Sequence, residues 1–414
     1  MSVWGIIDAA VEREFPRLVA MLTALVCTPS DNPPGDCATH AEIACHELTQ
    51  LGFTVERHAL PAAAVQASGM ISATNLIVRR KFGDGPTIAL NAHGDVVPPG
   101  LGWTHDPYGA QVEEGPRGPT MYGRGVAVSK SDFATYAGAL LALDAVAAAG
   151  ETLAGTVELH FTHDEETGGT LGPQWILDHG LSKPDFAICA GFSYGVVTAH
   201  NGCLHLEVTV TGRQAHAAMP ETGIDALETA TAILAALYEK RRQLSNTRSG
   251  VAGIVSPTLN VGLVSGGINT NVVPDRVAFR LDRRIIPEEN PSEAEDELRA
   301  LIVEAARAFA AHVDIRRILL ATPLAPLAGG EKLSAALRRQ AARVFETEIP
   351  EQGVPIYTDA RHYAARGIPT VLYGAGPRTL LEANGHNAEE NLRLGDLKGA
   401  TKVVAAALAE LLRP

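Results

Sequence analysis

The sequence predicts an α/β protein in which helices cover a mostly parallel sheet. Strand-like and helical segments alternate through the first half of the 414 residues. Several strands run into polar or glycine-rich segments at their carboxyl ends, where open α/β sheets place their sites. From about Gly195, apolar and polar residues alternate as in a half-exposed antiparallel strand. We therefore expect a second, smaller domain inserted into the first.

The first domain is expected over residues 1–196 and 320–414, and its elements follow from periodicity and caps. Residues 1–22 mix apolar and charged side chains, which predicts an amphipathic helix rather than a signal peptide. A capping box of Thr39 and Glu42 predicts the start of the next helix. The later strands are predicted at FTVERHAL, NLIVRR, TIALNAHGD, GTVELHFTHDEE, DFAICAG and TVLYGAG. The later helices are predicted at SDFATYAGALLALDAVAAAG and EKLSAALRRQAARVFE.

The inserted domain is expected over residues 197–319. It begins with the alternating strand VVTAHNGCLHLEVTVTGRQAH and continues with the helix TGIDALETATAILAALYEKRRQ. Two strands, SPTLNVGLVSGG and NVVPDRVAFRLDRR, precede a helix that a capping box of Ser292 and Glu295 would open. With a final strand, this β-α-β-β-α-β order predicts a small α+β domain of the ferredoxin-like type.

The amino-acid composition indicates which binding partners and which cellular compartment to expect. Lys and Arg total 34 against 47 Asp and Glu, a net charge of −13 that repels nucleic-acid phosphates and anionic lipid. We expect no nucleic-acid or membrane partner. The five cysteines show no C-x-x-C spacing, so they predict neither a disulfide framework nor a thiolate zinc site and are typical of a reducing compartment. A soluble, cytoplasmic protein is the expectation.

Two polar clusters at strand ends are the strongest candidates for a functional site. In NAHGDVVPPG, a strand delivers His93 and Asp95 to its carboxyl end, and a histidine oriented by a carboxylate is typical of metal binding. A hydrogen-bonded histidine without a metal is the alternative. In FTHDEETGG, the adjacent acids from Asp164 to Glu166 repel one another unless a cation or a proton relieves the repulsion. A solvated acidic turn is the alternative there.

Further motifs run in order along nearly the whole chain. They are HGDVVP at 93–98, GRG at 123–125, DEE at 164–166, VTVTGRQAHAAMPETGIDA at 208–226, NTNVVPD at 269–275, LDRR at 281–284, YTDARHYAARGIPTVLYGAGP at 357–377 and GHNAEENL at 385–392. Together they resemble the metallohydrolase family that includes acetylornithine deacetylase, succinyl-diaminopimelate desuccinylase, aminoacylase and the glutamate-releasing carboxypeptidases. The resemblance implies a catalytic α/β domain interrupted by a smaller dimerisation domain.

The resemblance also implies roles for residues of the larger domain. It makes Asp95 the group that orients a metal-binding histidine, and Glu165 the general base. The implied metal ligands are His93, Glu166 and His386.

From the smaller domain, the resemblance implies that His216 reaches the active site of the partner subunit and helps to stabilise a developing oxyanion; a histidine in a surface turn is the alternative. Residues in the matching motifs, Arg284, Asn269 and Asn271, would hold a substrate carboxylate. We therefore expect a small-molecule substrate and a homodimer or higher homo-oligomer.

Two positions depart from the family pattern. Where the family usually has an Asp that bridges two metals after GRG, this chain has Val128, and Gly191 stands where a second carboxylate is usual. Asp132 follows four residues later, where the next helix would point it elsewhere. The retained face of two histidines and one carboxylate would suit one divalent transition metal per active site, Mn, Zn, Co or Fe, held loosely.

The chemistry implied is hydrolysis of a C–N bond by metal-activated water. A single cation would stabilise less charge on an amide carbonyl, so an already activated substrate is favoured. One branch of the family is an aminohydrolase that converts nitroanthranilate, such as the 5-nitro isomer, to nitrosalicylate and ammonia, and this is the preferred interpretation. The alternatives are an N-acyl amino acid deacylase or dipeptidase with a reduced metal site, an inactive relative, and a non-catalytic protein that binds a small molecule.

Overall fold

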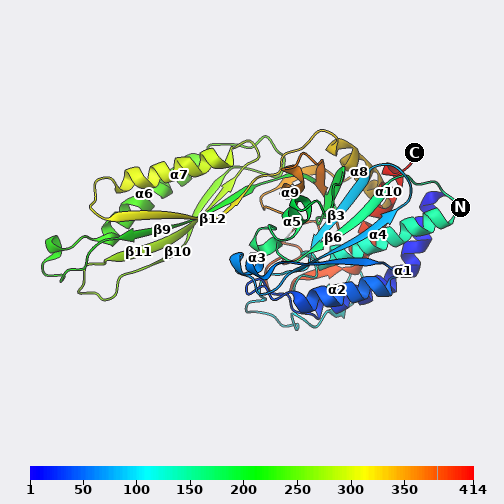
Figure 1. The fold of residues 1–414 in the computed structure, drawn as a ribbon, viewed down its shortest axis with the longest axis horizontal. Helices are drawn as coiled ribbons and strands as arrows, with labels where there is room; N and C mark the ends of the chain where they lie inside the picture. The colour runs from blue at the N-terminus through cyan, green and yellow to red at the C-terminus, as the bar shows by residue number, and fades with distance from the viewer. Residues whose placement is uncertain (380) are drawn as a thin grey trace. The chain divides into compact units, whose positions relative to one another are not determined.

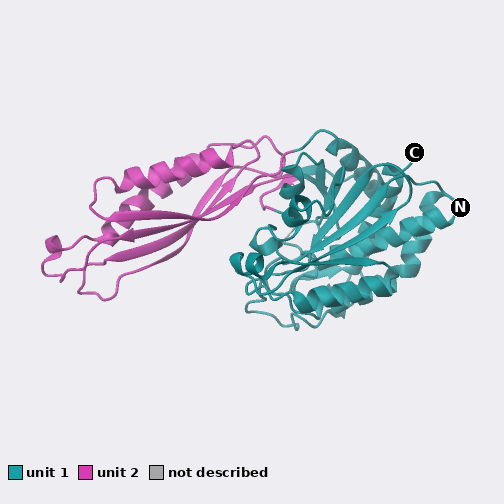
Figure 2. Ribbon diagram, viewed as in Figure 1, with its two compact units in different colours: residues 1–198, 326–352, 358–414 teal, residues 199–325, 353–357 magenta. Residues whose placement is uncertain are grey.

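The computed structural model describes residues 1–379 and 381–414, and the chain divides into two compact units (Figure 1, Figure 2). Unit 1 comprises residues 1–198, 326–352 and 358–414, and unit 2 comprises residues 199–325 and 353–357. The return of the chain to unit 2 at residues 353–357 has no signal in the sequence.

Unit 1 is built on an eight-stranded sheet with the order β1-β2-β6-β3-β7-β14-β8-β13. The strands are β1 (Val55–Ala59), β2 (Thr74–Lys81), β3 (Thr87–His93), β6 (Thr156–Thr162), β7 (Phe186–Cys189), β8 (Val196–His200), β13 (Glu351–Val354) and β14 (Thr370–Leu372). At the centre, β3 is parallel to β6 and β7, and β14 is parallel to β7, whereas β1 and β2 pair antiparallel toward one edge. The predicted α/β class is confirmed.

Helices cover this sheet (Figure 1). They are α1 (Val3–Val26), α2 (Ala38–Gln50), α3 (Ala62–Ala67), α4 (Lys130–Ala148), α5 (Pro173–Asp178), α8 (Gly330–Phe345), α9 (Ala360–Ala364) and α10 (Leu394–Leu411). α4 packs against α1 and α10 and is buried almost all round. A Cβ at Gly138 of α4 would lie 2.4 Å from Leu18 Cδ1 of α1, so glycine permits this close approach.

Unit 2 has the predicted β-α-β-β-α-β order. Its elements are β9 (Gly202–Thr211), α6 (Ala226–Leu244), β10 (Thr258–Gly266), β11 (Arg276–Ile285), α7 (Pro291–Ala306) and β12 (His312–Ala321). The strand order is β10-β11-β9-β12, and every neighbouring pair is antiparallel. The helices α6 and α7 pack on one face of this sheet, over alternate residues of β9 such as Leu204, Leu206 and Val208 (Figure 1). The ferredoxin-like prediction is confirmed.

Both predicted capping boxes are wrong. α2 begins at Ala38 with Cys37 as its N-cap, so Thr39 lies inside the first turn, and no side chain caps this end. α7 begins at Pro291, and the Asn290 side chain accepts hydrogen bonds from two backbone N–H groups of the first turn. An N-cap asparagine followed by proline satisfies a helix start without the later Ser and Glu. In the described part of the chain, no helix is long and apolar enough to cross a membrane.

The strand register determines where the functional residues meet. His93 of β3 pairs with Thr162 of β6, so the two strands end side by side. The polar segments that follow them therefore converge at the carboxyl edge of the sheet. The short 3-10 helix η1 (Glu165–Thr167) belongs to the second of these segments. A separate three-stranded sheet, β15-β5-β4, is formed by β4 (Gln111–Glu113), β5 (Thr120–Tyr122) and β15 (Asn391–Arg393).

Candidate active site

His93 is held at the end of β3 by hydrogen bonds on both sides. Its backbone N–H donates to Ser129 Oγ at 3.1 Å, and the Ser129 hydroxyl donates to the His93 carbonyl at 3.0 Å. On the ring, Nδ1 lies 3.0 Å from the Asp95 carbonyl oxygen and 3.4 Å from Asp95 Oδ1. Two oxygen acceptors at Nδ1 favour the tautomer with its proton there, which leaves the Nε2 lone pair for a cation.

Asp95 also fixes the turn that carries the acidic residues. Its carboxylate is fully buried, and Oδ1 accepts from the Glu165 N–H at 3.2 Å. Oδ2 accepts from the Glu166 N–H at 3.1 Å and from the Asn32 side-chain amide at 2.9 Å. One carboxylate thus positions His93 and both glutamates at once. Sequence reasoning missed Asn32, for which no local motif exists.

Glu165, Glu166 and His93 form a cluster whose ligand atoms all lie within 4.8 Å of one another. The His93 Nε2 is 4.0 Å from Glu165 Oε2. His386 joins the cluster from the distant C-terminal segment, with its Nε2 3.3 Å from Glu166 Oε1. Burial raises the pKa of Glu165 to about 7, helped by the charges of Glu166 and Asp95 and opposed by the two histidines. The structure therefore brings together five of the residues predicted for this domain.

A buried ion pair holds the segment that carries His386. Arg124 Nη1 donates to Glu390 Oε2 at 2.7 Å, and both side chains are almost completely buried. Glu390 Oε1 accepts from the N–H groups of Ala127 and Val128, each at 3.1 Å. The motifs GRGVAV and GHNAEENL are therefore joined by one carboxylate, and β15 then pairs with β5 immediately beyond.

Asp164 does not belong to this cluster. Its Oδ2 accepts from the Leu171 N–H at 2.6 Å, and a second bond comes from the Gly172 backbone, so this carboxylate folds the loop after β6. Burial raises the pKa of Asp164 to about 7, and the charge of Asp95 adds to the effect. Only two of the three adjacent acids therefore face the site.

The departure from the family pattern at Gly191 has a structural counterpart. A Cβ at Gly191 would lie 2.7 Å from Tyr373 N and 2.9 Å from Leu372 C, so a ligand side chain there would require β14 to move. The Asp132 carboxylate accepts hydrogen bonds from the Ala375 N–H at 2.7 Å and from the Gly191 backbone. Burial raises the pKa of Asp132 to about 7. Asp132 thus supports the backbone at the position where a ligand is missing.

Asp359 is a residue near the site that sequence reasoning missed. Its side chain is buried, and its Oδ2 has no hydrogen-bond partner in the part of the chain that the structure describes. Burial raises the pKa of Asp359 well above its ordinary value, and the charges of Glu165 and Asp164 add to the effect. A Cβ at Gly169 would lie 2.1 Å from Asp359 Oδ1, so the second glycine of the ETGG turn leaves room for this carboxyl. The signal was the TDAR string, which gave a family match but no role.

Among the predicted residues of unit 2, His216 and the two asparagines lie together. His216 is exposed, and its Nδ1 accepts from the Ala218 N–H at 3.1 Å. The next residue, Ala217, donates its N–H to the Asn271 carbonyl at 3.0 Å. Asn269 is exposed in the same loop.

Arg284 lies at the opposite end of the same sheet. The register pairs Thr211 with Arg276 and Cys203 with Arg284. A strand that runs from residue 276 to residue 284 spans about 26 Å. One chain therefore does not bring Arg284 and His216 together within unit 2.

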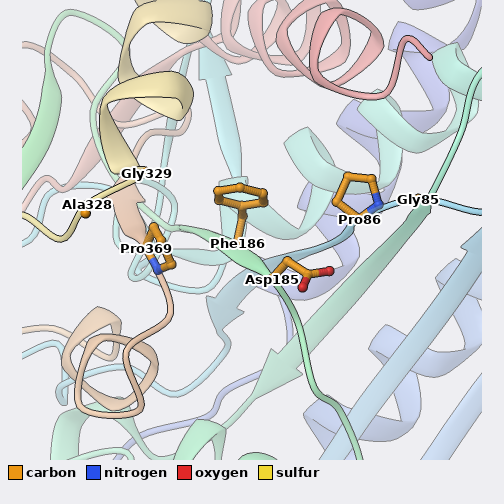
Figure 3. Close-up of a pocket in the computed structure, with 7 residues that line it drawn as sticks. All are labelled: Gly85, Pro86, Asp185, Phe186, Ala328, Gly329 and Pro369. Carbon is orange, nitrogen blue, oxygen red and sulfur yellow. The ribbon is translucent and has the colours of Figure 1, made fainter.

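A shallow pocket lies at the other end of the central strands of unit 1 (Figure 3). It is lined by Gly85, Pro86, Asp185, Phe186, Ala328, Gly329 and Pro369. The Asp185 carboxylate accepts from the N–H of Thr87, the first residue of β3, whereas His93 is its last. Asp185, the one acidic residue that lines this pocket, already accepts a hydrogen bond from the backbone. The lining residues therefore do not form a second catalytic site.

The fold and the cluster define a metal-dependent hydrolase of C–N bonds. The model of peptidase family M20/M25/M40 matches residues 89–410, and the chain belongs to this family.

Individual relatives agree with this assignment. The chain is 26% identical over 373 residues to the acetylornithine deacetylase of Pasteurella multocida, covering 88% of this chain and 91% of that one. A shorter match, 32% over 221 residues, covers 51% of this chain and 55% of the succinyl-diaminopimelate desuccinylase of Acidiphilium cryptum. Among solved structures, the Bacillus subtilis YXEP protein, described as a dinuclear metal binding peptidase from the M20 family, superposes with a TM-score of 0.67 at 18% identity, covering 97% of this chain and 99% of that one.

The hydrogen bonds of Asp95 generate a prediction about Asp95→Asn. Both carboxylate oxygens face N–H donors, so an amide NH2 in either orientation would oppose one of them. We expect the affinity for a divalent metal to fall about 10- to 100-fold, the range for loss of a group that orients a ligand. Competition with a chelating dye measures it. Asp185→Asn at the other end of β3 is the matched control and should bind metal as the unsubstituted protein does; unchanged affinity in Asp95→Asn would contradict the role given to Asp95.

Proposed function

We propose that this protein is a single-metal aminohydrolase that releases ammonia from an activated aromatic amine bearing a carboxylate, such as 5-nitroanthranilate. One observation carries the proposal beyond the family assignment. The two positions at which further metal ligands are expected hold Val128 and Gly191, and β14 leaves no space for a side chain at Gly191. The site therefore offers charge stabilisation suited to a substrate that disperses much of its own negative charge.

The donor set fits a divalent transition metal. Glu166 Oε1 is buried and accepts no hydrogen bond from the described residues, and the Nε2 of His386 lies 3.3 Å from it. In our proposal His93, Glu166 and His386 hold the ion, which matches the two-histidine, one-carboxylate pattern of sites with open positions. When bound, such an ion lowers the pKa of water and stabilises developing negative charge.

The residues of the chain would divide the remaining work. Glu165 is placed to take a proton from the attacking water and later to deliver it to the departing nitrogen, and its pKa of about 7 suits both transfers. Asp95 keeps the proton of His93 on Nδ1. Asp132 holds the backbone of Gly191 and Ala375 in place.

The substrate carboxylate would be held by Arg284, Asn269 and Asn271, and the oxyanion by His216. Since His216 and Arg284 lie at opposite ends of one unit 2, their joint action on one substrate requires two chains. This supports a homodimer formed through unit 2, with His216 acting on the partner's site.

A second candidate is an N-acyl amino acid deacylase or dipeptidase with one metal ion. The name of the relative from Pasteurella multocida favours it. Both candidates share the hydrolytic water and the same general base, and they differ in whether an amide or an aromatic amine is cleaved.

Replacing the two glutamates separately tests the division of roles. Glu165→Gln should keep the metal content of the unsubstituted protein and lose about 100- to 10,000-fold in kcat, the usual contribution of positioned proton transfer. Glu166→Gln removes a charged ligand, so the metal content of this variant should fall. Elemental analysis and turnover of each variant are the measurements. Two tightly held ions per chain that are both lost in His93→Ala, or identical behaviour of the two glutamate variants, would contradict this assignment.

Subunit mixing tests the action of His216 across the dimer. Glu165→Gln and His216→Ala should each be nearly inactive alone. After equal mixing with subunit exchange, about a quarter of the sites combine an intact Glu165 with an intact His216 from the partner, so that fraction of activity should return. Exchange is verified by mass spectrometry of differently tagged chains, and no recovery would exclude a role in trans.

Substrate comparison tests the aminohydrolase proposal. Ammonia release from 5-nitroanthranilate should exceed hydrolysis of N-acetylornithine, N-succinyl-diaminopimelate and dipeptides, because the nitro group takes up charge that one cation stabilises less well. Anthranilate without the nitro group is the matched control and should not react. Efficient cleavage of the amides with no activity on the nitroaromatic amine would establish the deacylase candidate instead.

A further inference from the structure

The sheet of unit 2 has a second face, opposite the one that α6 and α7 cover. Side chains alternate across a strand, so Cys203 and His205 of β9 lie on this second face while Leu204 and Leu206 enter the core. The register places Asp282 of β11 directly opposite His205. A thiol, an imidazole and a carboxylate therefore meet on two adjacent strands.

The three ligand atoms converge on one point. Cys203 Sγ is 3.2 Å from His205 Nε2, His205 Nε2 is 3.0 Å from Asp282 Oδ2, and Sγ is 3.8 Å from Oδ2. The same imidazole nitrogen faces both partners. A nucleophile–base–acid relay needs both ring nitrogens, one for the nucleophile and one for the carboxylate, so this geometry does not fit such a relay.

The distances fit a metal site instead. Zinc bonds to sulfur, nitrogen and oxygen of about 2.3, 2.05 and 2.0 Å at tetrahedral angles place the ligand atoms about 3.3 to 3.6 Å apart. The observed separations of 3.2, 3.0 and 3.8 Å bracket that range. We propose that Cys203, His205 and Asp282 form a binding site for zinc or a divalent ion of similar ligand preference. This site includes a sulfur ligand, which the cluster at His93 lacks.

Charge supports this assignment. Binding converts the Cys203 thiol to a thiolate and releases its proton to solvent, so the thiolate and the Asp282 carboxylate both present negative charge to the ion. Arg284 donates from Nε to Asp282 Oδ1 at 2.9 Å and from Nη2 to Oδ2 at 3.1 Å. The bond to Oδ1 would orient the carboxylate while Oδ2 serves the ion, as ligating carboxylates are commonly held.

Access and coordination number indicate how the ion would be used. Cys203 is buried, but the side chains of His205 and Asp282 are 34% and 29% exposed, so the ion enters from the second face. Three protein ligands leave a fourth tetrahedral position for water or for a donor atom of a small molecule. The site does not depend on which substrate the first cluster hydrolyses.

Cobalt(II) titration tests the proposal, because only a thiolate ligand produces a sulfur-to-cobalt charge-transfer band. We expect this band to saturate by two equivalents of added cobalt in the unsubstituted protein, because the His93 cluster also takes up one ion, and to disappear when excess zinc(II) is added. Cys203→Ser should abolish the band, and His205→Gln should weaken cobalt binding at least about tenfold. Cys27→Ser removes an exposed thiol and is the matched control, in which the band should be unchanged.

Each variant is checked for folding before its cobalt band is compared with that of the unsubstituted protein. Circular dichroism first verifies that Cys203→Ser folds; His205→Gln replaces a half-buried residue and provides an independent variant if it does not. Absence of the band at saturating cobalt, its persistence in Cys203→Ser, or its loss in Cys27→Ser would overturn the proposal. So would a charge-transfer band that titrates with unchanged cobalt affinity in His205→Gln.

Discussion

The carboxylate of Asp95 is the constraint on which the candidate active site depends. Removing a carboxylate from water is costly unless hydrogen bonds replace its hydration, and here two backbone amides and the Asn32 amide do so while His93 lies alongside. The same bonds hold Glu165 and Glu166 against their mutual repulsion. Segments far apart in sequence, at residues 32, 95 and 165, are thereby held in one arrangement.

Much of this arrangement is predictable because parallel strands bring their carboxyl ends to one edge. Strand periodicity located β3 and β6, so His93 and the acidic segment after β6 could be expected to meet. Residue spacing alone could not tell which of the acids faces the site, because Asp164 is turned away by a hydrogen bond from the Leu171 N–H, seven residues later. The family resemblance, and not the local pattern, singled out Glu165 and Glu166. Asp359 and Asn32 reach the site from distant segments without a local pattern. The crowding at Gly191 comes from β14, and strand order is not visible in residue spacing.

Unit 2 shows the same limit of sequence reasoning. Its strand and helix order follows from alternation and periodicity. Thiolate metal sites are recognised in sequence by short spacings within one loop, and the absence of such spacing among the cysteines argued against one. Cys203 meets Asp282 through strand pairing, which joins residues of any separation. The predicted start of α7 was wrong for a different reason: Asn290 and Ser292 are both polar residues that can cap a helix, and Asn290 is the one that does so.

The order of elements along the chain has a consequence for biosynthesis. All of unit 2 lies between Glu166 and His386, and so does the return segment 353–357. A nascent chain that has emerged only as far as η1 carries His93 and both glutamates without the last histidine or the Arg124–Glu390 pair that fixes its loop. Domains commonly fold as units during synthesis. Here the inserted unit can fold first, and the candidate site is completed only when the segment with His386 and Glu390 has followed it.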